Sequence, residues 1–95
     1  PAGTVLERII KYTNDRIEPL PIAATIPDFV ARHIALHADI IDRIVRACVE
    51  GDKQLFVSAL ADDPFLKNTE PEKIRGMVRR LFQLNKQFVH PGFAD

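Results

Sequence analysis

The longest run of periodic apolar positions lies between Pro27 and Gly51. Apolar side chains recur there every three or four residues, the spacing that places them on one side of an α-helix. Pro27 suits the first helical position, and Gly51 suits the left-handed residue that ends a helix. The pattern predicts a helix over residues 27–50. Its apolar face is expected to contain Val30, Ile34, Ile41, Ile44 and Cys48, widened by Phe29, Leu36, Ile40 and Ala47.

Two further amphipathic helices are expected after Gly51. Asp52 is placed to cap a short helix over residues 52–62, which ends before Pro64. Thr69 and Glu72 have the spacing of a capping box, which predicts a third helix over residues 70–89. Its apolar stripe covers about half of the circumference, enough to bury two sides of the helix. The stripe consists of Ile74, Met77, Val78, Leu81, Phe82, Leu84 and Phe88.

The residues before this helical region have an extended pattern. Apolar residues that favour strands flank the turn-forming stretch 13–15. Pro19 and Pro21 lack backbone donors, so this segment must be an edge or a surface wrap. A lone hairpin is marginal in water, and we expect this arm to lie on a surface outside the chain. The sequence predicts a mainly α fold, with a short hairpin-like arm over residues 1–24 and a helical region over residues 25–95.

Composition narrows the class of protein. Ninety-five residues allow one domain at most, and 13 basic residues balance 13 acidic ones. We therefore expect neither a nucleic acid nor an anionic membrane as partner. Cys48 is the only cysteine, so the expected location is the cytoplasm. We expect this thiol to be buried and inert. The chain begins at Pro1 without a methionine, and we expect a processed chain or a fragment of a longer protein.

The histidines are the candidate metal ligands. His33 and His37 are four residues apart, which places both imidazoles on one side of the predicted helix. Ile34 stands where a metalloprotease motif has its glutamate. The remaining candidate ligands, Asp39 and His90, are not at a spacing typical of a metal site. His37 also falls within the apolar stripe, so the simpler interpretation is a histidine in a core or an interface.

Other charged residues form weaker candidate sites. The pairs Glu50–Asp52 and Asp62–Asp63 could be catalytic acids, but capping and turn formation explain them better. A basic patch of Arg75, Arg79 and Arg80 is either a solvated helix face or a site for phosphate or a partner. No residue is assigned a catalytic role.

Three short signatures give the chain a resemblance to a known family. The first is Asn14, Asp15, Ile17, Pro19, Leu20 and Pro21, followed by Pro27 and the long helix. The second consists of Ala47, Glu50, Gly51 and Asp52, and the third of Ala59, Leu60, Asp62, Asp63 and Pro64. Their order and spacing over residues 14–90 resemble the C-terminal region of family four glycoside hydrolases. That group contains α-glucosidases, α-galactosidases and α-galacturonidases.

The resemblance implies that the chain forms part of the C-terminal α+β domain of a lactate dehydrogenase-like glycosidase. Members use NAD and a divalent metal, usually manganese, to acidify a sugar proton and eliminate the leaving group. This sequence contains neither the dinucleotide fingerprint nor the family's cysteine–histidine metal region. No residue of this chain is therefore assigned a catalytic, cofactor-binding or metal-binding role on the basis of the resemblance. The structural signature positions are Pro27, Ala47, Gly51, Asp52, Asp63 and Pro64.

These observations predict a single C-terminal domain fragment that is structural and not catalytic by itself. Its expected partner is the remainder of the parent enzyme, or a second copy that covers the apolar helix faces. NAD and manganese would belong to the full-length enzyme, and the chain alone is expected to bind neither. Two alternatives stay open: a stand-alone helical interaction or dimerisation module, and a metal-binding protein centred on His33 and His37.

Overall fold

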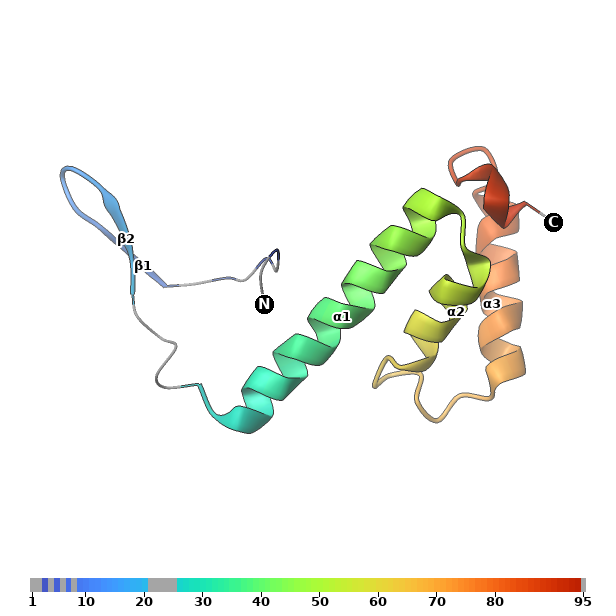
Figure 1. Ribbon diagram of the computed structural model, residues 1–95, viewed down its shortest axis with the longest axis horizontal. Helices are drawn as coiled ribbons and strands as arrows, with labels where there is room; N and C mark the ends of the chain where they lie inside the picture. Colours follow the sequence, from blue (N-terminus) through green and yellow to red (C-terminus); the bar gives the residue numbers. More distant parts are fainter. Residues whose placement is uncertain (1–2, 4, 6, 8, 21–25, 95) are drawn as a thin grey trace. The chain divides into compact units, whose positions relative to one another are not determined.

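The computed structural model describes the chain apart from residues 1–2, 4, 6, 8, 21–25 and 95. The fold is mainly helical with a short antiparallel hairpin near the N-terminus, which confirms the predicted fold class (Figure 1). The elements are β1 (Ile10–Tyr12), β2 (Ile17–Pro19), α1 (Asp28–Glu50), α2 (Lys53–Ala61), α3 (Pro71–Leu84) and the 3₁₀ turn η2 (Pro91–Phe93).

The chain divides into two compact units, Pro1–Leu36 and His37–Asp95. Helix α1 runs through the boundary between the two units. The expected boundary between an arm and a helical region, at residues 24 and 25, lies outside the described residues. Within the described residues, no helix is both long and apolar enough to cross a membrane.

The hairpin in the first unit is short and its apolar side chains are exposed. Tyr12 pairs with Ile17 in the antiparallel register, and the turn is closed by Thr13, whose backbone N–H donates to the Arg16 carbonyl at 2.9 Å. The Thr13 hydroxyl donates to the same carbonyl at 2.9 Å. Tyr12 is 73% exposed and Ile17 is 60% exposed, so neither side chain is buried against the described residues.

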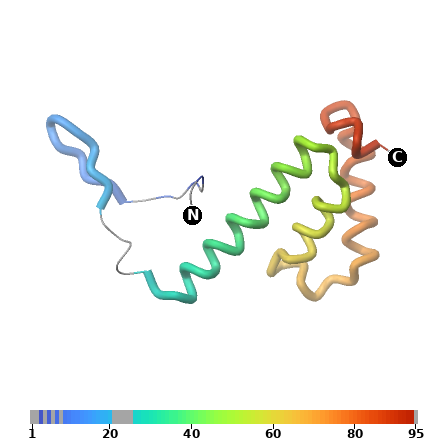
Figure 2. Tube along the Cα trace, in the orientation of Figure 1, coloured from blue at the N-terminus to red at the C-terminus, as the bar shows by residue number. Residues whose placement is uncertain are grey.

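Helix α1 ends and α2 begins within two residues, as the sequence predicts. Gly51 has φ +72°, a conformation that glycine adopts without strain, and the Asp52 N–H donates to the Ala47 carbonyl at 3.0 Å. The Asp52 carboxylate then caps α2 by accepting from the Leu55 N–H at 2.9 Å. Helix α1 can therefore stop and the chain can reverse without leaving these backbone groups unpaired (Figure 2).

Helix α3 differs from its predicted form at both ends. Pro71 occupies the first turn and Glu70 is the N-cap, without a side-chain capping bond, so the predicted capping box of Thr69 and Glu72 is wrong. The reason is that proline fits the first helical position, which leaves Thr69 outside the helix. The helix ends at Leu84 and not at residue 89. Asn85 terminates it, because its side-chain amide donates to the Leu81 carbonyl at 2.8 Å.

The hydrophobic core of the second unit lies where α2 and α3 pack against the end of α1. Helices α2 and α3 run in opposite directions beside each other (Figures 1 and 2). Three aromatic rings form the centre of the core: the Phe56 and Phe82 centroids are 5.0 Å apart, and the Phe82 and Phe93 centroids are 4.2 Å apart. The buried cluster consists of Ala47, Phe56, Ile74, Val78, Phe82 and Phe93.

Only one edge of the predicted apolar face of α1 is buried. Ile40 and Ala47 are 3% and 0% exposed, whereas Ile41 on the neighbouring side is 60% exposed. Cys48 is exposed, so the expectation of a buried thiol is wrong. The cause is the direction from which α2 and α3 approach: small Ala47 permits close contact, and the core forms on its side of the helix.

Candidate functional site

The histidines of α1 do not belong to a described metal cluster. His33 is exposed and His37 is half-buried, one turn apart on the helix. Among the described residues, no group of three or more His, Cys, Asp and Glu side chains is placed to hold a metal ion. The pair by itself supplies two ligands, fewer than a structural zinc site needs. The alternative of a metal-binding protein therefore stays a prediction.

Two of the acidic residues near α2, Asp52 and Asp62, have structural partners. Asp52 caps the start of the helix, and Asp62 is its C-cap residue. The Asp62 carboxylate also forms an ion pair with Arg43 of α1 at 2.8 Å, and Arg43 pairs with Asp39 at the same distance. Arg43 thus links α1 to the end of α2. Its pKa is raised by the hydrogen bond to Asp62, against a smaller opposing effect of burial.

The family-like signature positions form turns and close contacts. The Pro27 carbonyl accepts from the N–H groups of Val30 and Ala31, each at 3.0 Å, at the start of α1. The Asp63 carboxylate accepts from the Phe65 N–H at 2.8 Å, which orders the turn through Pro64. With Ala47 in the core and Gly51 in the left-handed region, these residues shape the backbone.

Two helices carry exposed apolar stripes. The α1 stripe consists of Ile41, Val45, Cys48 and Val49, and the α3 stripe consists of Met77, Leu81 and Leu84. Each stripe lies beside a buried face of the same helix, so the apolar surface continues from the core to the outside. Exposed apolar surface of this kind makes each stripe a candidate interaction surface.

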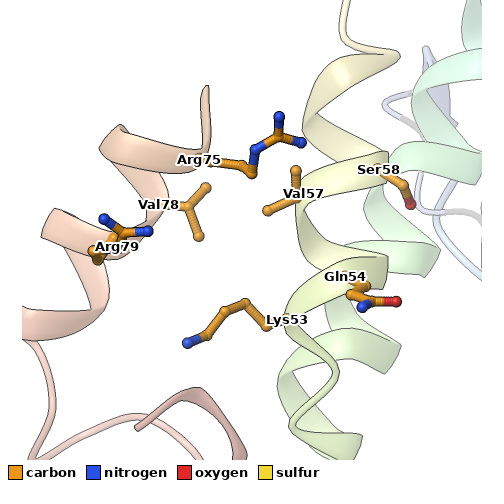
Figure 3. A pocket seen from close by; sticks show the side chains of 7 residues that line it. All are labelled: Lys53, Gln54, Val57, Ser58, Arg75, Val78 and Arg79. Atoms are coloured by element: carbon orange, nitrogen blue, oxygen red, sulfur yellow. The ribbon is translucent and has the colours of Figure 1, made fainter. Parts of the chain in front are cut away.

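A basic groove lies between α2 and α3. Its volume is about 410 Å³, within the range of small-molecule sites. Val57 of α2 and Val78 of α3 face each other across it, and Lys53 and Arg75 extend from opposite walls (Figure 3). Arg79, Gln54 and Ser58 complete the lining. Among the described residues, none that lines this groove is acidic.

A second hollow of about 180 Å³ continues the basic surface toward the C-terminus. It shares Lys53 and Arg79 with the basic groove and adds Lys86 and His90. The His90 side chain is oriented by a hydrogen bond that its Nδ1 atom accepts from the Gly92 N–H at 3.0 Å. The linings of the two hollows together contain four Lys or Arg side chains, those of Lys53, Arg75, Arg79 and Lys86.

The sequence indicates only part of this groove. Arg75 and Arg79 belong to the basic patch expected from the sequence, and the structure places both in the lining, while Arg80 is not among the lining residues. The contribution of Lys53 was not expected, because only the packing of α2 on α3 brings it opposite the arginines. Arg75 also bonds Glu72 one turn earlier, and this hydrogen bond lowers the pKa of the Glu72 carboxyl.

Comparison with known proteins gives one distant similarity. No protein-family model and no solved structure matches the chain. Over 87 residues, the chain is 26% identical to a protein named alpha-galacturonidase from Thermoanaerobacter italicus. The match covers 92% of this chain and 19% of the relative, so the chain spans about a fifth of that protein's length. This similarity supports a relationship to glycoside hydrolases.

Proposed function

We propose that the chain is the C-terminal structural part of a glycoside hydrolase of the family-four type. In this role it supports hydrolysis of O-glycosidic bonds without supplying reacting groups. One observation carries the proposal: the α1 stripe is exposed on a helix whose adjacent side, at Ile40 and Ala47, is buried. The distant similarity to a much longer alpha-galacturonidase suggests what covers this stripe. We propose that the remainder of such an enzyme packs against it.

Burial of the α1 stripe would give a substantial driving force for this packing. Val45 and Val49 are 54% and 71% exposed, and Ile41 in the same stripe is also exposed. Full burial of an aliphatic side chain stabilises the folded state by about 1.5–3 kcal/mol. Because these side chains are largely exposed, packing against more protein would provide part of this free energy. The α3 stripe offers a second such surface, so packing against more protein is favourable at both helices.

The proposal assigns the chemistry to other parts of the enzyme. NAD and a divalent metal, manganese in the resembled family, would be bound outside this chain, in a cytoplasmic enzyme. We assign no reaction step to the described residues. Their role is to complete and stabilise the domain that the substrate contacts.

The exposed thiol of Cys48 provides the test. Iodoacetamide labelling is measured under native conditions in this chain and in the longer protein encoded by its reading frame. We expect rapid labelling of the chain alone and strong protection in the longer protein. Equal labelling in both, or a reading frame without a dinucleotide-binding segment, would overturn the proposal. Protection in the isolated chain together with a dimeric mass would instead show that a second copy of the chain covers the stripe.

A matched pair of variants separates packing from general damage. Val45→Ser removes apolar surface from the α1 stripe, whereas Arg46→Ser changes the adjacent exposed residue outside it. In the longer enzyme, we expect Val45→Ser to lower the melting temperature and Arg46→Ser to leave it nearly unchanged. The same effect from both variants would count against a covered stripe.

A further inference from the structure

The basic groove has the features of a binding site and not only of a solvated helix face. Its cationic side chains come from both walls, Lys53 from α2 and Arg75 and Arg79 from α3 (Figure 3). The groove also has an apolar part, which consists of half-buried Val57 with the buried side chain of Val78 beneath the surface. A ligand in this groove would meet positive charge and an apolar surface at the same time.

The positive charge is local. The whole chain carries 13 basic and 13 acidic residues, yet none of the described residues lining either hollow is acidic. Glu72 is a carboxylate that acts on this surface, through its bond to Arg75. Arg79 and Lys53 line both hollows, and Lys86 extends the cationic surface past them. Such an arrangement fits an elongated anion better than a single carboxylate.

We propose that the two hollows form one site for a small molecule carrying several phosphate groups, of the nucleoside polyphosphate class. The phosphates would lie along Arg79, Lys53 and Lys86, where guanidinium and ammonium groups donate charge-assisted hydrogen bonds. The organic part would lie over the half-buried side chain of Val57. This site is separate from the proposed packing role and does not depend on it.

Binding of ATP, tripolyphosphate and adenosine to the chain is measured by isothermal titration calorimetry. We expect ATP to bind most tightly, tripolyphosphate more weakly because it lacks an organic body, and adenosine not to bind. Tripolyphosphate as tight as ATP would overturn the part of the proposal that places an organic body on the apolar part of the groove, and absence of ATP binding would overturn the site. Affinity should fall as salt rises, because the charges are exposed.

Two arginine variants provide the control for general charge attraction. Arg79→Gln removes a cation shared by both hollows, and Arg80→Gln removes the same charge at the next residue, which lines neither. We expect about tenfold weaker ATP binding for Arg79→Gln, as for the loss of one charge-assisted hydrogen bond, and little change for Arg80→Gln. Equal losses would overturn the site, since they would indicate attraction to net charge alone. Circular dichroism confirms that both variants are folded.

Discussion

The backbones of Gly51 and Gly92 are in direct contact. A Cβ atom added to Gly92 would lie 2.5 Å from the Gly51 carbonyl oxygen and 2.9 Å from the Gly51 Cα atom. Gly92 belongs to η2, which carries Phe93 into the aromatic core, and Gly51 ends α1. The contact between these glycines therefore joins the end of α1 to the C-terminal turn.

We predict that Gly92→Ala destabilises the second unit. The obstructing atoms are backbone atoms, which cannot rotate away as the end of a side chain can. Overpacking of this kind costs about 1–3 kcal/mol in the free energy of unfolding. Urea denaturation followed by circular dichroism measures the loss. An unchanged midpoint would show that η2 does not keep this contact in solution.

Gly76→Ala is expected to have the opposite effect. Gly76 lies inside α3, and a Cβ atom there would meet nothing within 4 Å. Alanine restricts the unfolded chain and favours the helix, which should stabilise the protein by about 0.5–1 kcal/mol. The same urea titration measures the gain. A loss of stability would mean that another surface covers this position.

Phe82→Ala should be strongly destabilising. Phe82 is 6% exposed and contacts the rings of both Phe56 and Phe93, so its removal leaves a cavity in the aromatic core. The expected cost is about 3–5 kcal/mol. Phe88→Ala is the matched control, because that ring is 79% exposed and should contribute little. Thermal unfolding of the two variants distinguishes these outcomes.

The bond between Arg75 and Glu72 predicts a pH dependence. The hydrogen bond from Arg75 lowers the folded-state pKa of the Glu72 carboxyl below that of the unfolded chain. Its contribution to stability is therefore present above the unfolded-state pKa and is lost as the pH falls through the folded-state pKa. Because both side chains are exposed, the contribution is small.

Nuclear magnetic resonance titration of the Glu72 side chain checks this assignment. Arg75→Gln should raise the pKa of Glu72 toward its ordinary value, because the principal cause of the shift is removed. Arg80→Gln serves as the control, since Arg80 is not among the groups that shift this carboxyl. A pKa of Glu72 that is the same in all three proteins would contradict the ion pair.

Local signals in the sequence were sufficient to place the helices. Pro27, Gly51 and Asp52 act through their own backbone preferences or through neighbours a few residues away, so they mark helix ends without knowledge of the fold. The failed capping box shows the limit of such signals. Thr69 had the right spacing, but Pro71 competed for the first helical position and moved the start of α3.

The sequence by itself determined the mainly helical class, the hairpin and most of the helix ends, because these depend on interactions between residues close along the chain. Tertiary structure decided which edge of each apolar stripe is buried. It placed Ala47 in the core, left Cys48 exposed, and brought Lys53 opposite Arg75 and Arg79. These outcomes depend on how α2 and α3 pack against each other and against α1, and helical periodicity does not encode that direction of approach.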